Sequence, residues 1–184
     1  DGPGLVVSNN TFEGQNAYGL YNYATNPALV QTVVAYNDFR NIALFDQLGL
    51  NGMGLAADVP LASKSGKAIE TDCQNGWIHH NTVTNVGYSG INFYNTGNIV
   101  EYNYVKDVCL VKDDGGGIYT WGSSTDQATP GNNNSIIRYN FVDGVMGSTA
   151  GKVGTALSGS GIYLDNHTGG VTVQGNIIAH CSLS

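Results

Sequence analysis

Three charged side chains stand directly before a run of glycines near the middle of the chain. They are Lys112, Asp113 and Asp114, in the segment KDDGGGIYTWG. Glycines let a backbone bend sharply or approach a ligand closely. A carboxylate beside such a bend can take up or release a proton during a reaction, and Lys112 can pair with it or tune it. A further carboxylate, Asp165, occurs in a similar segment, SGIYLDN.

Aromatic residues accompany both carboxylate segments. The segments contain Tyr119, Trp121 and Tyr163, and the related segment GINFY ends on Tyr94. Exposed aromatic rings pack against the C–H faces of sugars, while carboxylates bond sugar hydroxyls or transfer protons. The sequence therefore predicts a carbohydrate site whose substrate-binding residues are Tyr94, Tyr119, Trp121, Tyr163, Asp113 and Lys112.

The elements that position these residues are repeats. Six times, an apolar residue is followed three positions later by asparagine and two positions further on by another apolar residue. A fixed pattern with variable spacing above a minimum indicates solenoid coils from which loops project. We expect each asparagine to adopt the left-handed conformation at a corner, with its amide bonded to the next in a ladder. The six are Asn10, Asn37, Asn81, Asn103, Asn140 and Asn176, at intervals of 27, 44, 22, 37 and 36 residues.

A second pattern lies between the asparagine motifs, in the segments GLYNY, AIETD, GINFY, GIYTW and GIYLD. Its period of two predicts short strands whose side chains alternate inward and outward. The inward positions are Leu20, Ile69, Ile91, Ile118 and Ile162, followed two residues later by Asn22, Thr71, Phe93, Thr120 and Leu164. The outward positions form two columns, Tyr21, Glu70, Asn92, Tyr119 and Tyr163 in one, and Tyr23, Asp72, Tyr94, Trp121 and Asp165 in the other.

Together the two patterns predict an all-β protein, a single-stranded right-handed parallel β-helix (β-solenoid) of about six coils. We expect residues 1–184 to form one domain, with loop excursions at 46–65 and 123–134. Long loops of this kind more often carry function than fold. Neither end has a polar cap in its sequence, so we expect the chain to belong to a longer β-helix or to associate end to end.

The composition limits the possible partners. With 41% hydrophobic residues and 26 glycines, the chain suits a packed solenoid with tight corners rather than a disordered segment. The net charge of −7 argues against nucleic acid or an anionic membrane as partner. No apolar run reaches transmembrane length. The negative charge also disfavours a polyuronate, which usually meets a basic groove.

The segments KDDGGGIYTWG and SGIYLDN resemble the Asp-x-Gly-Gly-Ile-Tyr and Gly-Ile-Tyr-Leu-Asp motifs of secreted right-handed β-helix proteins of polysaccharide degradation. That group includes glycoside hydrolases that act on fucosides and xylosides, and the specific resemblance covers about residues 109–176. It implies an extracellular, carbohydrate-active protein that hydrolyses glycosidic bonds without a cofactor. It also implies that Asp114 and Asp165 are the catalytic acid and base.

Two other functions fit the same residues. In a polysaccharide lyase or epimerase, Asp113 and Asp114 would hold a calcium ion that neutralises a uronate. Lys112 or Arg138 would then abstract the proton next to the uronate carboxyl group. In a glycan-binding adhesin or a fibre subunit, the aromatic columns would bind sugar without reaction.

A further outward column contains His79, Glu101 and Arg138 as successive neighbours. A carboxylate between two potential cations is most simply a surface ion ladder, which contributes little to stability in water. The same column could instead form a catalytic set. If Asp114 does not reach Asp165, the alternative carboxylate partners for Asp165 are Asp113, Glu101 and Asp143.

Hydrolysis by Asp114 and Asp165 sets a geometric condition. Seven residues in register separate Asp114 from the position equivalent to Asp165, and as continuous strand these would hold the carboxylates more than ~20 Å apart. Glycosidic chemistry needs roughly 5 to 9.5 Å. We therefore expect Gly115 to Gly117 to fold Asp114 back over the sheet. Asp165 would then be the general acid and Asp114, close to Lys112, the base or nucleophile.

Overall fold

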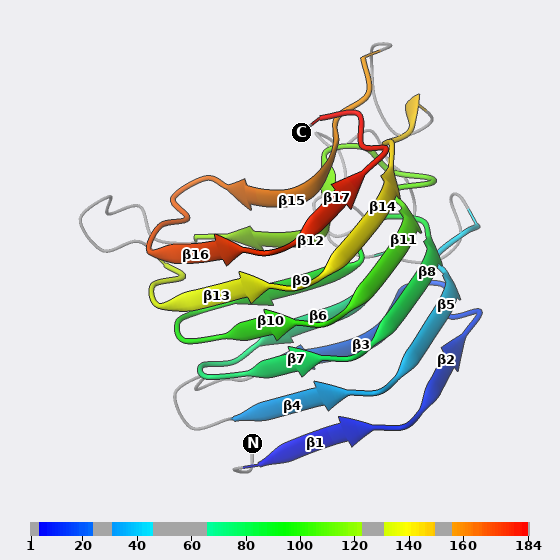
Figure 1. Ribbon diagram of the computed structural model, residues 1–184. Coiled ribbons are helices and arrows are strands. Elements are labelled where there is room, and N and C mark those ends of the chain that lie inside the picture. Colours follow the sequence, from blue (N-terminus) through cyan, green and yellow to red (C-terminus); the bar gives the residue numbers. More distant parts are fainter. Residues whose placement is uncertain (1–3, 24–30, 46–65, 123–130, 150–155, 184) are drawn as a thin grey trace.

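The structure is a computed structural model that describes residues 4–23, 31–45, 66–122, 131–149 and 156–183. In this part of the chain all paired strands are parallel, and consecutive strands visit three sheets in turn. The chain thus winds as a parallel β-solenoid with three faces (Figure 1). The predicted all-β solenoid is confirmed, and it stacks residues that lie far apart in sequence into columns.

Each sheet takes one strand from each successive turn of the chain. Sheet A contains β1 (Leu5–Ser8), β4 (Thr32–Ala35), β7 (Trp77–His79), β10 (Ile99–Glu101), β13 (Ser135–Arg138) and β16 (Val171–Gln174). Sheet B contains β2 (Thr11–Glu13), β5 (Asp38–Ile42), β8 (Thr82–Val86), β11 (Tyr104–Val108), β14 (Phe141–Val145) and β17 (Ile177–Ala179). Sheet C contains β3 (Tyr18–Tyr23), β6 (Lys67–Asp72), β9 (Ile91–Tyr94), β12 (Gly115–Trp121) and β15 (Gly159–Asp165).

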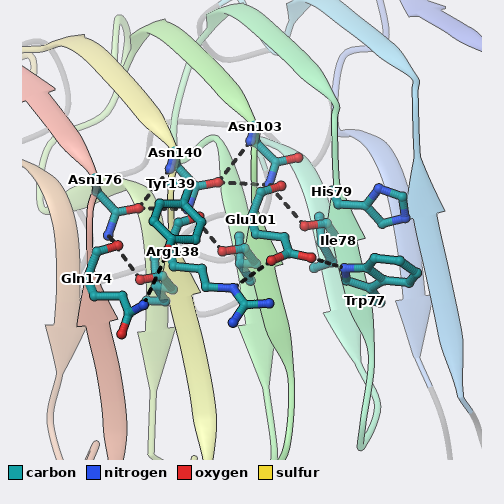
Figure 2. Close-up of polar contacts among 12 residues, drawn as sticks. Trp77, Ile78, His79, Glu101, Asn103, Arg138, Tyr139, Asn140, Gln174 and Asn176 are labelled. Carbon is teal, nitrogen blue, oxygen red and sulfur yellow. Dashed lines mark hydrogen bonds and ion pairs between the residues drawn. The ribbon is translucent and has the colours of Figure 1, made fainter.

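The six asparagines form the predicted ladder at the corner between sheets A and B. From Asn10 to Asn140, each side-chain amide donates to the amide oxygen of the asparagine in the next coil, at 2.9–3.0 Å. Each side-chain amide also donates to the backbone carbonyl two residues earlier, as Asn103 does to Glu101 (Figure 2). The ladder thus joins neighbouring coils and closes the turn within each coil.

The backbone conformation at this corner differs from the prediction. The residues with positive φ are those directly before the asparagines, not the asparagines themselves. The asparagine must remain extended because sheet B begins directly after it. The side chains before it point outward, and their rings stack from Tyr36 through His80 and Tyr102 to Tyr139, with centroids 4.9 to 5.3 Å apart.

The interior follows the predicted register of sheet C closely. Ile69, Ile91 and Ile118 are completely buried, as are Phe93 and Thr120. Leu20 and Ile162 are partly buried and pack against this core. Leu164 is an exception, since 41% of it is exposed. It lies on β15, an edge strand of sheet C, where no further described strand covers it.

A glycine stands directly before the inward apolar residue in every strand of sheet C except β6, which has Ala68, and the reason is steric. A Cβ atom at Gly90 would lie 2.5 Å from the carbonyl oxygen of Gly117, and one at Gly117 would collide with Val142 of sheet B. Gly117 and the following Ile118 therefore both face the interior, which interrupts the alternation of the strand. The interruption turns the residue before the glycine, such as Gly116 or its counterpart Lys67, to the outer face.

The excursion at 46–65 lies outside the described residues, as does 123–130 of the second excursion. Residues 131–134 form a turn that leads into β13. Within the described ranges, the structure contains no helix long and apolar enough to cross a membrane.

Candidate functional site

The outer face of sheet C carries a cleft of about 560 Å³. The two outward columns align as predicted, since Glu70 pairs with Tyr21 and Asn92, and Trp121 pairs with Asp165. The cleft runs across these strands and the loops beside them. It is lined by Tyr21, Tyr23, Lys67, Glu70, Asp72, Tyr88, Asn92, Tyr94, Asn95, Tyr119, Trp121, Asp165 and Asn166. Four of the predicted site residues, Tyr94, Tyr119, Trp121 and Asp165, are among them.

Asp165 is held at one end of the cleft by two hydrogen bonds. The hydroxyl of Tyr119 donates to Oδ2 at 2.7 Å, and the backbone N–H of Asn166 donates to Oδ1 at 2.7 Å. Burial raises the pKa of the Tyr119 phenol, and the carboxylate of Asp165 raises it further. The phenol therefore stays protonated and remains a donor. Trp121 lies beside Asp165 in register with 42% of its surface exposed, which leaves an aromatic surface next to a fixed carboxylate.

Asp114 reaches the same region, but by a different bend from the one predicted. Asp114 itself has a positive φ of 55°, and Gly115 to Gly117 belong to β12 rather than to a loop. These glycines allow close packing, because a Cβ at Gly115 would lie 2.7 Å from the ring of Tyr88. The hydroxyl of Tyr88 donates to the backbone carbonyl of Asp114 at 2.8 Å and so fixes the bend.

Tyr163 connects the two carboxylates. Its hydroxyl donates to Oδ1 of Asp114 at 3.2 Å, and the same phenol interacts with Asp165. Burial and the charges of both carboxylates raise the pKa of Tyr163 to about 12, so the phenol stays protonated. The bend at Asp114 thus brings its carboxylate to Tyr163, whose phenol also feels the charge of Asp165.

Four predicted site residues do not line the cleft: Asp114 and Tyr163, which lie beside Asp165, and Lys112 and Asp113. The backbone N–H of Ser158 donates to Oδ1 of Asp113 at 2.8 Å, and the Ser158 hydroxyl donates to Oδ2. The ammonium of Lys112 lies 5.2 Å from the centre of the Tyr88 ring and is buried. Consecutive side chains at a bend point in different directions, so Lys112 and Asp113 contact other residues than Asp114 does. These contacts suit a structural role for both.

The opposite end of the cleft contains charged residues that were not predicted as site residues. The ammonium of Lys67 lies 2.6 Å from Oε2 of Glu70 and 3.4 Å from the hydroxyl of Tyr94. Asp72 accepts a hydrogen bond from the side chain of Asn95, and burial raises its pKa despite that bond. Strict alternation would place Lys67 and Glu70 on opposite faces of β6, so only the interruption at Ala68 could have revealed this pair.

Asn92 lines the cleft, and its buried side-chain amide has no hydrogen-bond partner in the protein. It is completely buried, yet neither Oδ1 nor Nδ2 makes a hydrogen bond to the protein. Burial raises the pKa of the Tyr94 phenol, and the Asn92 amide lies close enough to lower that pKa in part, but the two groups do not have hydrogen-bond geometry. Leaving a buried amide without partners costs about 1–3 kcal/mol. A polar group in the cleft could supply the missing partner.

The column of His79, Glu101 and Arg138 forms as predicted, but on sheet A. Glu101 accepts from Arg138 Nε at 2.6 Å and from Trp77 Nε1 at 2.7 Å (Figure 2). Burial tends to raise the pKa of Glu101, but the two hydrogen bonds and the charge of Arg138 outweigh it and lower the pKa overall. This column is on a different face from Asp165.

Neither remaining alternative partner faces the cleft with Asp165. Asp143 lies on sheet B, with its Oδ1 2.6 Å from Nδ1 of His180, and Asp113 binds Ser158. For the calcium alternative, the described residues contain no group of three or more His, Cys, Asp or Glu side chains that could hold a metal ion. Asp113 and Asp114 point to different partners, Ser158 and Tyr163.

In comparisons with known proteins, no family model, no curated protein and no solved structure matches the chain.

Proposed function

We propose that this protein is a right-handed parallel β-helix that hydrolyses glycosidic bonds of a polysaccharide outside the cell, with Asp114 and Asp165 as its carboxylate pair. The observation that carries the proposal is the position of Tyr163, which is hydrogen-bonded to Asp114 and lies in the field of Asp165, a residue of the aromatic cleft. Right-handed winding is the hand of nearly all connections between parallel strands. The extracellular location rests on the resemblance of the two aspartate segments to secreted β-helix proteins.

The cleft has the parts that glycoside hydrolysis requires. Trp121 and Tyr23 offer exposed aromatic surface, 42% and 59% exposed, against which a sugar ring can pack. Asp114 and Asp165 both act on the phenol of Tyr163, which suits a pair in which one carboxyl group protonates the leaving oxygen and the other acts on the anomeric carbon or on water. Asp114 is exposed, so it can reach a bound substrate.

The hydrogen bonds favour an assignment of roles opposite to the one expected from sequence. Both oxygens of Asp165 accept hydrogen bonds from fixed donors, which suits a carboxylate that stays in place as base or nucleophile. Within the described residues, Asp114 makes a side-chain hydrogen bond through Oδ1 alone, to Tyr163. Its second oxygen is free to carry a proton to a leaving group, so we assign the general acid to Asp114.

The proposal is tested by measuring the release of reducing ends from a panel of neutral oligosaccharides and polysaccharides. Wild type should hydrolyse at least one member, and Asp165→Asn and Asp114→Asn should each lower the rate by about 10²–10⁴-fold with an unchanged circular dichroism spectrum. Asp143→Asn on sheet B is the matched control and should keep full activity. Sugar binding without any hydrolysis by wild type would replace the proposal with the glycan-binding adhesin. Unchanged activity in either Asp114→Asn or Asp165→Asn would also overturn it.

A further inference from the structure

The charge of the cleft narrows the class of sugar it can take. Among the described residues, those that line it include three carboxylates, Glu70, Asp72 and Asp165, and a single cationic side chain, Lys67. Lys67 is already paired with Glu70 at 2.6 Å. Asp72 and Asp165 accept hydrogen bonds from uncharged groups, namely the Asn95 amide, the Tyr119 hydroxyl and the Asn166 N–H. The cleft therefore presents net negative charge and would repel uronate or sulfated sugars.

Lys67 shows how the cleft accommodates a positive charge. Its ammonium lies between the carboxylate of Glu70 and the side chain of Tyr94, 5.9 Å from the centre of the Tyr94 ring. The ammonium lies 3.4 Å from the Tyr94 hydroxyl, at the edge of the ring, so a carboxylate and a phenol oxygen hold it together. The side chains of Lys67 and Glu70 are only 6% and 11% exposed, so this ammonium is bound largely out of water.

A carboxylate also lies beside an exposed aromatic side chain at two other positions in the cleft. Asp72 is in register with Tyr23 on one side and with Tyr94 on the other. Asp165 is in register with Trp121. Tyr23 and Trp121 are 59% and 42% exposed, so a ligand can reach the carboxylate and the ring at both positions.

A second and independent feature points to a polar ligand between these positions. Asn92 lies on β9, between Glu70 on β6 and Tyr119 on β12, and is completely buried with both side-chain polar atoms unpartnered. A ligand that offers a donor and an acceptor, as sugar hydroxyl and amino groups do, can satisfy both atoms.

We propose that the cleft on sheet C binds oligosaccharides that carry free amino groups, and that Asp72 selects them by pairing with a sugar ammonium. This rests on the proposed function, because it names the sugar class for the same cleft. Burial has raised the pKa of Asp72, and a bound cation would offset this penalty. Asp72 is thus a specificity residue, separate from the proposed catalytic pair.

The test is calorimetric titration at low salt with three probes: glucosamine tetramer, N-acetylglucosamine tetramer and galacturonic acid tetramer. Wild type should bind the glucosamine tetramer about 10-fold more tightly than the N-acetylated one, and the uronate least. Adding 0.5 M salt shortens the Debye length from about 30 Å at 0.01 M to about 4 Å and should reduce this preference. In Asp72→Asn the preference should fall to within about 3-fold.

Two further variants keep the result interpretable. Tyr23→Ala removes the exposed ring beside Asp72 and should also reduce the preference, while Asp143→Asn on sheet B should leave it unchanged. Equal or tighter binding of the N-acetylated or uronate tetramer by wild type would overturn the inference, as would an undiminished preference in Asp72→Asn. Failure of all three probes to bind would also overturn it. The proposed function falls separately, if wild type hydrolyses no member of the oligosaccharide panel or if Asp114→Asn or Asp165→Asn keeps full activity.

Discussion

The hydroxyl of Tyr119 donates a 2.7 Å hydrogen bond to Oδ2 of Asp165, between the neighbouring strands β12 and β15. The two residues are 46 positions apart in sequence. Tyr119 pairs in register with Tyr163, so its phenol reaches diagonally to the carboxylate two residues further along. Solenoid stacking therefore gives Asp165 a fixed orientation that its own strand could not provide.

Removing this hydrogen bond should reduce activity without unfolding the protein. Tyr119→Phe keeps the ring and its edge contact with Tyr163, whose centroid lies 5.4 Å away, and deletes only the hydroxyl. A hydrogen bond to a charged group contributes about 1.5–3 kcal/mol, so the hydrolysis rate should fall by roughly 10–100-fold. Steady-state kinetics with thermal unfolding as the control measures this. An unchanged rate would show that Tyr119 does not orient a reacting group.

Asp72 should lower stability near neutral pH. Because burial raises its pKa in the folded state, ionisation costs more in the folded than in the unfolded protein. The stability associated with Asp72 is therefore fully present below the unfolded pKa, near 3.8, and is lost as pH rises through the folded pKa.

Asp72→Asn should accordingly raise the melting temperature at pH 7 and have little effect at pH 3, where the wild-type carboxyl is protonated. The asparagine can still accept the hydrogen bond from Asn95, so no contact is lost. Melting curves of both proteins at the two pH values provide the comparison. A variant that is less stable than wild type at pH 7 would contradict this account of Asp72.

The asparagine ladder should stabilise the central coils much more than the first. Asn103 accepts from the backbone and side chain of Asn81 and donates to Asn140, all at 3.0 Å and out of contact with water. Asn103→Ala leaves several buried groups unpaired and should cost about 2–4 kcal/mol. Asn10→Ala, at an exposed position, should cost about 1 kcal/mol or less. Urea denaturation would show the difference, and equal effects would argue against a cooperative ladder.

The inward and outward sides of β12 should respond differently to truncation. Ile118 is fully buried and Trp121 is 42% exposed. Ile118→Ala should lower the free energy of unfolding by about 2–5 kcal/mol. Trp121→Ala should lower it far less while weakening oligosaccharide binding. The result that would contradict the assignment is an unfolded Trp121→Ala protein or one with undiminished sugar binding.

Much of the fold could be predicted because each coil of a solenoid repeats the same corner and the same alternation of inward and outward side chains. The asparagine spacing locates the corner between sheets A and B, and the period of two separates Ile118 from Tyr119 and Trp121. Register then follows from stacking, so the pairing of Trp121 with Asp165 could be predicted without any structure.

The parts that could not be predicted are breaks in this regularity. The left-handed residue precedes each asparagine because the asparagine itself begins a strand. The two consecutive inward residues at Gly117 and Ile118 are set by the nearness of sheet B, which no local pattern reports. For the same reason the sequence indicated neither the pairing of Lys67 with Glu70 nor the turning of Asp113 toward Ser158.

The central claim is that Asp114 and Asp165 act together on a glycosidic bond, and a double-mutant comparison of hydrolysis rates tests it most directly. Asp114→Asn and Asp165→Asn should each lower kcat/KM by about 10²–10⁴-fold, and the double variant should be little worse than either single one, because catalytic groups that act as a unit are not additive. Full activity in either single variant, with the fold intact by circular dichroism, would contradict the claim.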